Sequence, residues 1–223
     1  SAWLAMREAE LVEHRWKPAP PPDPDKVLLG DRLVGLSTFS GYSINERSML
    51  FRDKSADELA AIEQRDCGKP TRQAKADAAA LARYFEFYAG ACDKLHGDTI
   101  PYLDGYSVMT WREPHGVTGH IIPWNYPMQI FGRSVGGALA AGNVSVVKPA
   151  EDACLSLIRV AQLAAEVGFP AGAINIVTGY GHEVGDALAR HPGVDHISFT
   201  GSPSVGTIIQ QVAAERHCPV TLE

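Results

Sequence analysis

The 223-residue sequence has no paired-cysteine motif, no excess of positive charge and no uncharged segment long enough to cross a membrane. The uncharged run from Pro114 to Gly132 contains Pro123 and Pro127 and is shorter than the roughly 20 residues of a membrane-spanning helix. Lys and Arg number 20 against 26 Asp and Glu, for a net charge of −6, which argues against binding to nucleic acid or to an anionic membrane. The eight histidines show no HExxH motif and no paired metal-ligand spacing, so no metal site is expected.

The cysteines lie far apart along the chain, at Cys67, Cys92, Cys154 and Cys218. Without a CxxC pair they predict neither a disulfide framework nor a zinc ribbon, and they favour a reducing, cytoplasmic location. Hydrophobic residues at 45% and charged residues at 21% are typical of a globular protein. A chain of this length buries about 70% of its unfolded surface, enough for a substantial core.

The first part of the chain divides into two segments. Residues 1–54 include five prolines between Pro18 and Pro24, which favour extended backbone and predict an irregular N-terminal segment. Residues 55–96 carry the three- and four-residue apolar spacing of two helices, separated near Gly68.

Residues 97–113 are expected to form a β-hairpin. The Asp104-Gly105 dipeptide is a strong turn signal, and it separates two runs rich in Thr, Tyr, Val and Trp. No third strand flanks these runs, and an isolated two-stranded ribbon is only marginally stable in water. We therefore expect the hairpin to protrude and to pack against another subunit.

Residues 114–223 alternate apolar, strand-like runs with helical stretches. Strands are expected at 117–122, 144–148, 174–178, 196–200 and 220–223. Helices are expected at 127–141, 155–167, 182–190 and 203–215. Strands joined by crossover helices predict an α/β fold with a doubly wound, parallel, Rossmann-like sheet.

Ligands of an open parallel sheet bind beyond the carboxyl ends of its strands, so the loops that follow strands are candidate sites. Ser202 and Pro203 are a typical N-cap and first-turn pair, and the helix N-terminus there suits a phosphate. The alternative is that Ser202 only caps its own helix. Asn125, in a loop bounded by prolines, could donate to a developing oxyanion or satisfy turn backbone.

Two further loops carry weaker signals. Lys148 and Glu151 could bracket the hydroxyls of a ribose, or they could form only a surface ion pair. Residues 179–185 read GxGxxxG, one residue longer than a dinucleotide fingerprint, and a tight turn explains these glycines equally well.

A rival motif spans Gly132 to Gly136, which matches the GxSxG nucleophile elbow of α/β-hydrolases with Ser134 as the nucleophile. The elbow requires a strand, a sharp turn and then a helix. Here the residues that follow Pro127 indicate one continuous helix, which argues against a hydrolase.

Five sequence blocks then point to a family. They are Ile122–Pro127 (IPWNYP), Gly142–Glu151 (GNVSVVKPAE), Gly168–Gly179 (GFPAGAINIVTG), Phe199–Ser202 (FTGS) and Thr221–Glu223 (TLE). In their order and spacing, they resemble the cofactor-binding half of the aldehyde dehydrogenase superfamily over residues 55–223. The resemblance implies oxidation of an aldehyde to a carboxylic acid through a cysteine thiohemiacetal and an acyl-enzyme. It also implies NAD as the cofactor, with NADP possible, and a homodimer or homotetramer held by the hairpin at 97–113.

The resemblance assigns roles to individual positions. Asn125 is similar to the amide that holds the oxyanion, and Glu223 to the general base that activates water. Lys148 and Glu151 resemble the pair that binds the adenosine ribose, and Glu151 favours NAD because a 2′-phosphate would meet its carboxylate. Ser202 resembles the pyrophosphate contact, and Gly181 lines the adenine side. The other implied cofactor-binding residues of the NAD-binding segment 114–223 are Ile121, Ile122, Pro123, Trp124, Phe199 and Gly201.

The sequence departs from the family in one important respect. The nucleophilic cysteine of the family lies downstream of the motif that Glu223 begins, and none of the four cysteines stands in its motif. Cys67 only takes a place usually held by Thr or Asn, before Gly68. The catalytic domain is therefore expected to be absent from this chain, which by itself is expected to be inactive, with a nucleotide-binding fragment as the alternative.

Helical spacing places four side chains on one face that leads away from the Asn125 loop: Tyr126, Gln129, Ile130 and Arg133. They are candidates for lining the approach of the aldehyde, and packing is the alternative that we prefer for Ile130. Arg133 would favour anionic aldehydes.

Overall fold

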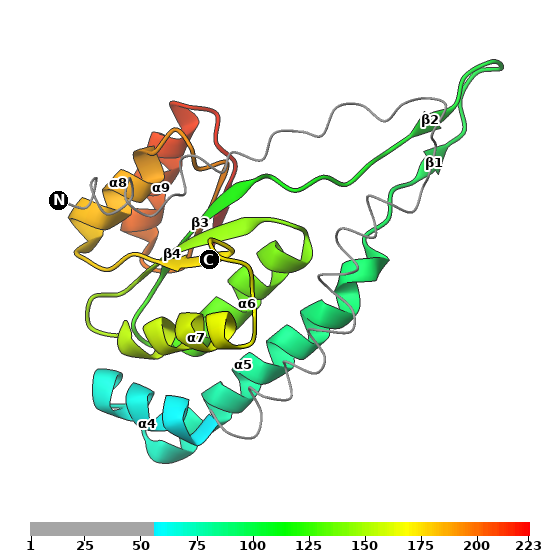
Figure 1. Ribbon diagram of the computed structural model, residues 1–223. Coiled ribbons are helices and arrows are strands. Elements are labelled where there is room, and N and C mark those ends of the chain that lie inside the picture. The colour runs from blue at the N-terminus through cyan, green and yellow to red at the C-terminus, as the bar shows by residue number, and fades with distance from the viewer. Residues whose placement is uncertain (1–55) are drawn as a thin grey trace.

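The computed structural model describes residues 56–223, so the irregular segment expected at 1–54 lies outside the described residues (Figure 1). Within them, a parallel sheet forms the central layer of the α/β fold. Its strands are β3 (Val117–Ile122), β4 (Val144–Pro149), β5 (Ile174–Ile176), β6 (His196–Phe199) and β7 (Val220–Leu222). All five match expected strands, although β5 is shorter than the apolar run that predicts it.

The order of the strands across the sheet is β5-β4-β3-β6-β7, with every neighbouring pair parallel. The chain first builds outward from β3 to β5 and then returns to the other side of β3 with β6 and β7. The direction reverses between β3 and β6, which makes this boundary the topological switch point of a doubly wound sheet. Ligand-binding crevices form at such points, beyond the carboxyl ends of the two strands.

Helices cover both faces of the sheet (Figure 1). On one face lie α6 (Pro127–Ala140) and α7 (Leu155–Glu166), and on the other lie α8 (Asp186–Arg190) and α9 (Pro203–Ala214). The helix expected at 182–190 forms as a short π-helix, η2 (Gly181–Gly185), followed by α8. A π-turn of this kind often occurs at a functional site.

A further pair of helices, α4 (Ala56–Cys67) and α5 (Thr71–Ala91), packs outside α6 and α7. Both lie where the apolar spacing predicts them. Gly68 joins them with a φ of +69°, a left-handed conformation that glycine adopts without strain. Pro70 fixes the start of α5.

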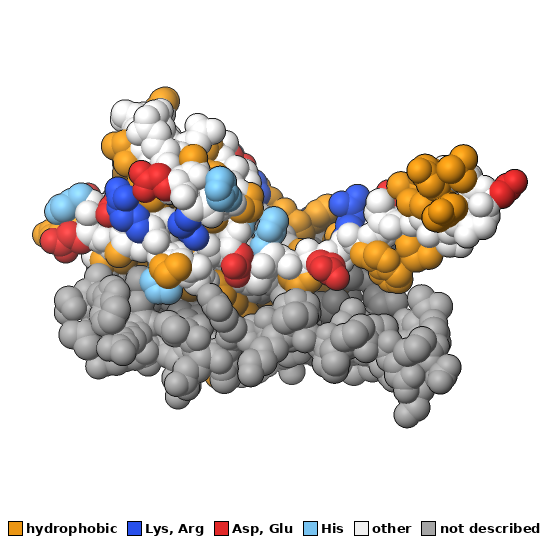
Figure 2. Space-filling model, turned by 90° about the horizontal axis from the view of Figure 1, so that it is seen from above, with side chains coloured by type: hydrophobic (Ala, Val, Ile, Leu, Met, Phe, Trp, Pro, Cys, Tyr) orange, Lys and Arg blue, Asp and Glu red, His pale blue; other side chains and the backbone are white. Residues whose placement is uncertain are grey.

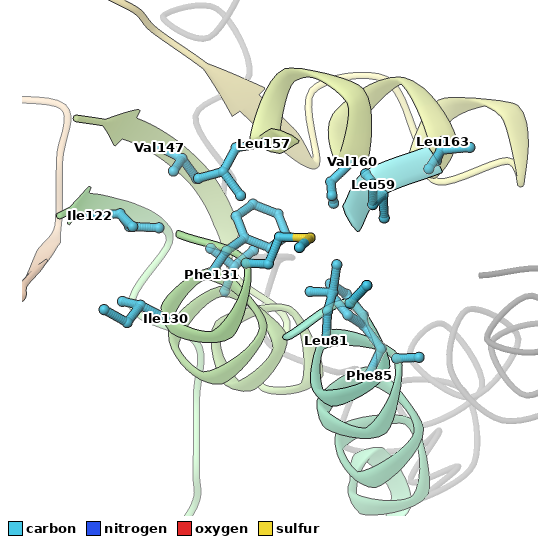
Figure 3. Packing of buried hydrophobic residues seen from close by; sticks show 14 residues of the cluster. Leu59, Leu81, Phe85, Ile122, Ile130, Phe131, Val147, Leu157, Val160 and Leu163 are labelled. Carbon is cyan, nitrogen blue, oxygen red and sulfur yellow. The ribbon is translucent and has the colours of Figure 1, made fainter. Parts of the chain in front are cut away.

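The larger core lies between the sheet and these four helices (Figure 3). Phe131 of α6 is fully buried at its centre, next to Val147 of the sheet, Leu157 of α7 and Leu81 of α5. Burial of each such side chain contributes about 1.5–3 kcal/mol. A second core, on the opposite face, joins Ile197 to α8 and α9.

Two glycines of α6 allow α5 to approach closely. An added Cβ at Gly132 would lie 3.1 Å from Leu81 Cδ1, and one at Gly136 would lie 2.7 Å from Tyr88 Cδ2. These contacts fix α6, and with it the loop that precedes α6, against α5.

The hairpin projects from the body of the molecule (Figures 1 and 2). After a short 3₁₀ turn, η1 (Cys92–Lys94), the strands β1 (Thr99–Ile100) and β2 (Val108–Met109) pair antiparallel, a shorter ladder than the sequence indicates. Its large apolar side chains are exposed: Ile100, Tyr102, Leu103, Tyr106, Met109 and Trp111. Among the described residues, no helix is long and apolar enough to cross a membrane.

Candidate functional site

The loops at the switch point are held together by backbone hydrogen bonds. The amide of Thr200, after β6, donates to the carbonyl of Ile121 in β3 at 3.2 Å. The amide of Glu223, after β7, donates to Phe199 at 3.0 Å, and Gly201 donates to Glu223 at 3.2 Å. The loop that carries Asn125, the loop that carries Ser202 and the backbone of Glu223 therefore lie on one edge of the sheet.

Asn125 lies in the short connection between β3 and α6. Ile122 ends the strand in the core, and Pro127 begins the helix, where its lack of an N–H costs nothing. Tyr126 is the N-cap residue, with a φ of −137° and no hydrogen bond from its side chain to the helix. The Asn125 amide is exposed, and in residues 56–223 it makes no hydrogen bond, so the turn does not use it. It is free to donate to a ligand.

Ser202 begins α9 as the sequence predicts. Its hydroxyl accepts from the amide of Val205 at 3.5 Å, a long capping bond, and lies 3.2 Å from the hydroxyl of Ser204. The first-turn amides of α9 face the edge of the sheet, and the positive end of the helix dipole favours an anion there. Gly201 is packed on Phe199, because an added Cβ would lie 2.5 Å from the ring carbon Cζ.

Lys148 and Glu151 form an ion pair beyond β4, with 2.8 Å between Lys148 Nζ and Glu151 Oε2. Only 3% of the Lys148 side chain is exposed, against 41% for Glu151, so the pair is more than a surface contact. The hydrogen bond from Lys148 lowers the pKa of Glu151, and the backbone amide of Gly181 acts in the same direction. Glu151 is therefore an ionised acceptor at neutral pH, with Gly181 beside it.

In the glycine-rich segment beyond β5, Gly179 lies in a bend, and Gly181 and Gly185 begin and end the π-helix η2. Gly179 has a φ of +146°, and an added Cβ would lie 2.4 Å from Val184 Cγ2. The rings of Tyr180 and His182 stack on each other at the start of η2, with 5.7 Å between their centroids.

Glu223 lies at the same edge of the sheet, directly after β7. Its Oε2 atom accepts a hydrogen bond from the guanidinium of Arg133, on α6, and lies 3.4 Å from Thr200 Oγ1. Both charged side chains are about half exposed. A carboxylate thus lies on the edge that also carries Asn125 and Ser202.

Comparison with known proteins identifies the family. The pattern described as "Aldehyde dehydrogenase family" matches residues 45–223. The chain belongs to the aldehyde dehydrogenase family.

Individual relatives agree with this assignment. Hydroxyisobutyraldehyde dehydrogenase of Mycolicibacterium austroafricanum is 48% identical over 170 residues, 76% of this chain and 34% of its own length. The crystal structure of a putative aldehyde dehydrogenase from Burkholderia cenocepacia superposes with a TM-score of 0.79, and the two sequences are 74% identical. The match covers 81% of this chain and 38% of the Burkholderia chain. The structure of the NAD⁺ complex of a Bacillus cereus aldehyde dehydrogenase matches with a TM-score of 0.79 and 41% sequence identity. This match covers 82% of this chain and 37% of the Bacillus chain. The chain thus spans between a third and two fifths of the length of these relatives.

The hydrolase alternative is excluded by the backbone of this aldehyde dehydrogenase chain. Residues 132–136 lie inside α6, which begins at Pro127, so Ser134 follows seven residues of helix and not a strand and a sharp turn. The Ser134 hydroxyl donates to the carbonyl of Ile130 at 2.9 Å, a contact within the helix.

The four residues expected along the aldehyde approach divide into two pairs. Ile130 is buried in the core, so packing, the preferred alternative, is confirmed. Gln129 donates to Asp77 of α5 at 2.6 Å and is therefore engaged in the protein interior. Tyr126 and Arg133 are exposed at the edge.

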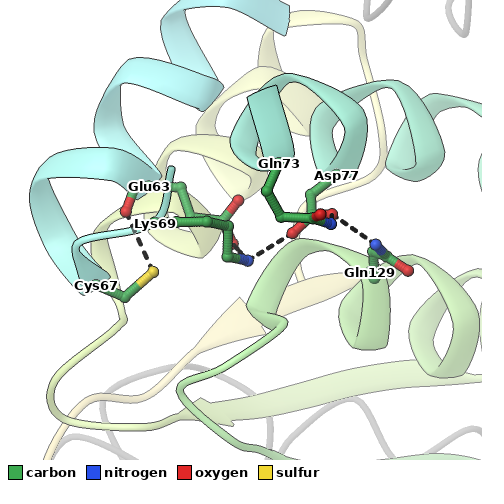
Figure 4. A network of polar contacts seen from close by, with 6 residues as sticks. All are labelled: Glu63, Cys67, Lys69, Gln73, Asp77 and Gln129. Carbon is green, nitrogen blue, oxygen red and sulfur yellow. Dashed lines mark hydrogen bonds and ion pairs between the residues drawn. The ribbon is translucent and has the colours of Figure 1, made fainter. Parts of the chain in front are cut away.

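Sequence reasoning missed a cluster of buried polar residues at the start of α6 (Figure 4). Lys69 lies between Glu63 and Asp77, whose carboxylates are fully buried. One feature of the sequence could have indicated this cluster. Asp77 falls in the apolar stripe of its helix, next to Ala74, Ala78 and Leu81, so its carboxylate had to be buried. In the described part of the chain, no group of three or more His, Cys, Asp or Glu side chains could hold a metal ion.

Proposed function

We propose that this chain is the cofactor-binding part of an NAD-dependent aldehyde dehydrogenase that oxidises an aldehyde to a carboxylic acid. The observation that supports the proposal most strongly is the arrangement of Asn125, Ser202 and Glu223 on one edge. They follow β3, β6 and β7, which are neighbours in the sheet. A nucleotide and a carbonyl group can meet only if these loops share one edge.

The edge has the chemical groups that a dinucleotide requires. The first turn of α9 and the Ser202 hydroxyl would hold the pyrophosphate. Glu151, ionised and supported by Lys148, would accept hydrogen bonds from the adenosine ribose. The remaining contacts would come from Gly181 and from the two edge loops, at Ile121, Ile122, Pro123, Trp124, Phe199 and Gly201. When bound, NAD supplies the hydride acceptor.

The preference for NAD follows from charge. NADP carries a phosphate on the ribose hydroxyl that Glu151 would contact, and two negative groups at hydrogen-bonding distance repel. NADP would bind with that phosphate turned away from Glu151.

Asn125 and Glu223 would carry the chemistry on the protein side. The Asn125 amide would donate to the oxyanion that forms when a thiolate attacks the aldehyde carbonyl, an effect typically worth about 3 kcal/mol for one donor. Glu223 would accept a proton from the water that hydrolyses the acyl-enzyme.

The attacking thiolate is not assigned to this chain. Burial raises the pKa of the Cys67, Cys154 and Cys218 thiols above the usual value. A raised pKa keeps a thiol protonated and makes it a poor nucleophile. We therefore expect these 223 residues alone to bind nucleotide without oxidising aldehydes, which makes an inactive nucleotide-binding fragment the second candidate function.

Calorimetric titration of the purified chain with NAD and with NADP tests the cofactor proposal. We expect saturable binding that is tighter for NAD. The absence of any binding heat at millimolar NAD would contradict it. Aldehyde-dependent formation of NADH by the same sample would contradict the expected inactivity.

We also propose that the hairpin of residues 97–113 joins subunits of the whole protein into a homodimer or homotetramer. The support is its exposed apolar surface, which includes Tyr102, Leu103 and Tyr106 at the tip. Replacement of these three by Ser should shift the whole protein to a smaller species in light scattering. The proposed location is cytoplasmic, on the basis that none of the four cysteines forms a disulfide.

A further inference from the structure

A charged cluster is buried where the turn between α4 and α5 meets α6, outside the groups proposed for cofactor and substrate (Figure 4). Lys69 Nζ lies 2.5 Å from Asp77 Oδ2 and 3.2 Å from Glu63 Oε1. The two carboxylates are fully buried, and 7% of the Lys69 side chain is exposed. Gln73 donates to the same Asp77 carboxylate at 2.7 Å.

Stability alone does not explain such a cluster. Removing three charges from water is costly, and apolar residues of similar volume often serve a core equally well. Buried charges do, however, hold their neighbours in one arrangement, because each loses much when its partner moves away. The residues that the cluster contacts therefore indicate what it fixes.

Three of its contacts reach the first turn of α6. The Lys69 ammonium lies over the ring of Tyr126, 4.8 Å from the ring centroid, a cation–π contact. Asp77 accepts from Gln129 at 2.6 Å. Burial raises the pKa of Glu63 above its usual value, and the charge of Lys69 and the backbone amide of Met128, in the first turn, oppose this in part. Among the described residues, Glu63 Oε2 has no hydrogen-bond partner.

The lysine stays charged in this setting. Burial alone would lower the pKa of Lys69, but the hydrogen bonds and charges of Asp77 and Glu63 outweigh burial and raise it above the usual value. The contact with Tyr126 is therefore one between a permanent cation and an aromatic ring at every physiological pH. Tyr126 itself is the residue immediately after Asn125.

We propose that Lys69 is a positioning residue for the amide of Asn125, acting through the Tyr126 ring and the first turn of α6. The inference rests on the oxyanion role proposed for Asn125. The Asn125 side chain makes no hydrogen bond of its own within residues 56–223, so the backbone on either side sets the position from which it can donate. The sheet fixes one side through Ile122, and the Lys69 cluster fixes the other. A preorganised donor needs both supports, because a displacement of the donor by about 1 Å can lower the rate about 100-fold.

The first experiment uses the chain itself. The amide of Ile130 donates to the carbonyl of Tyr126 at 3.0 Å, so its hydrogen exchange, measured by NMR, reports whether the first turn is intact. We expect Lys69→Met to accelerate exchange at Ile130 at least tenfold and to leave the central strand amide of Val147 unchanged. Lys75→Met is the matched control, because among the described side chains Lys75 pairs only with the exposed Asp57. Equal exchange at Ile130 in the two variants would overturn the proposal.

Lys69→Met leaves the carboxylates of Glu63 and Asp77 without their cation, which could itself disturb the fold. A second pair of variants keeps Lys69 and changes only the ring that it contacts. Tyr126→Leu removes the aromatic ring, whereas Tyr126→Phe keeps it, and the side chain is exposed enough for both to fold. We expect faster exchange at Ile130 in Tyr126→Leu only. The same rate in both variants would show that the ring contact positions nothing.

The kinetic experiment uses the complete enzyme that contains this segment. We expect Asn125→Ala to lower kcat about 100-fold or more. Lys69→Met should lower kcat at least tenfold with KM for NAD within about twofold, and it should have no further effect in the Asn125→Ala background. Lys69→Arg, which keeps a cation over the ring, should restore part of the rate.

The outcomes separate the two proposals. An unchanged kcat in Asn125→Ala would contradict the proposed function itself. The positioning role would be overturned, with the proposed function intact, if kcat fell strongly in Asn125→Ala but did not fall in Lys69→Met. The same conclusion would follow if the two substitutions lowered kcat independently, so that their effects multiplied in the double variant.

Discussion

The guanidinium of Arg133 donates a hydrogen bond to Glu223 Oε2, across 90 positions of sequence. Arg133 lies on α6, which follows β3, while Glu223 follows β7, two strands away on the other side of the switch point. The contact joins the helix that carries the Asn125 loop to the proposed general base. It also places a carboxylate beside the charge that the sequence suggested for recognition of anionic aldehydes.

The pairing leads to a prediction for Arg133→Ala in the complete enzyme. Because Glu223 already offsets the positive charge, the KM for an anionic aldehyde relative to a neutral one should rise less than about fivefold, the scale of an exposed ion pair. Hydrolysis of the acyl-enzyme should slow more, about tenfold, because Glu223 loses the group that orients it. Stopped-flow kinetics with both aldehydes measures the two effects, with Arg83→Ala on α5 as the control. A large change in KM with unchanged hydrolysis would reverse this interpretation.

Glu151→Gln should change the choice of cofactor. The substitution keeps hydrogen-bonding capacity but removes the charge that would repel a 2′-phosphate. We expect NAD affinity to fall about tenfold and NADP affinity to stay equal or rise, so that the preference for NAD nearly disappears. Calorimetric titration of the chain with both nucleotides measures this. Glu183→Gln, on the exposed side of η2, removes the same charge nearby and should leave the preference intact.

Much of this fold could be predicted from the sequence because its signals are local. Apolar runs and helical spacing gave the five strands and the helices, and the Ser202-Pro203 pair gave the start of α9. The doubly wound topology follows from the alternation of strands and helices. The IPWNYP and FTGS blocks begin at the last residues of the neighbouring strands β3 and β6, as expected if they serve one site.

The remainder depends on contacts that are distant in sequence. Asp77 meets Gln129 across 52 positions, and no local pattern reports such a pair. The hairpin ladder is shorter than its β-rich sequence indicates, because within residues 56–223 each of its strands has only one neighbour to pair with. The glycines at 179–185 fit both a turn and a fingerprint in the sequence, and neither pattern predicts the π-helix η2 in which Gly181 and Gly185 lie.

His120 should make the protein sensitive to acid. Its Nε2 lies 2.9 Å from Thr118 Oγ1, which donates to the carbonyl of Val144, so Nε2 carries the proton and Nδ1 is the atom left without a partner in the described part of the chain. Burial, with a smaller contribution from His196, lowers the pKa of His120 to about 3 from 6.5. The unfolded state therefore binds a proton that the folded state does not, and stability is lost as pH falls below about 6.5.

Between pH of about 7.5 and 5, this single group should remove about 2 kcal/mol from the free energy of unfolding. His120→Gln has no titrating side chain there, so its stability should fall by correspondingly less over the same range. His191 and His196, whose pKa values are also lowered by burial, remain in both proteins and cancel in the comparison. Urea unfolding at several pH values measures the difference, and parallel pH profiles for the two proteins would contradict the assignment.

Gly136→Ala should destabilise the protein although it places a better helix former in α6. The new methyl group would lie 2.7 Å from Tyr88 Cδ2, a ring atom close to the α5 backbone that cannot move without shifting the helix. Overpacking of this kind costs about 1–3 kcal/mol, while the gain in helix propensity is at most about 1 kcal/mol. Gly90→Ala on α5 is the matched control, because no atom of residues 56–223 lies within 4 Å of its added Cβ. We expect Gly136→Ala to lower the Tm by several degrees and Gly90→Ala to leave it equal or slightly higher, and equal gains in both would show that α5 and α6 are not held at this distance.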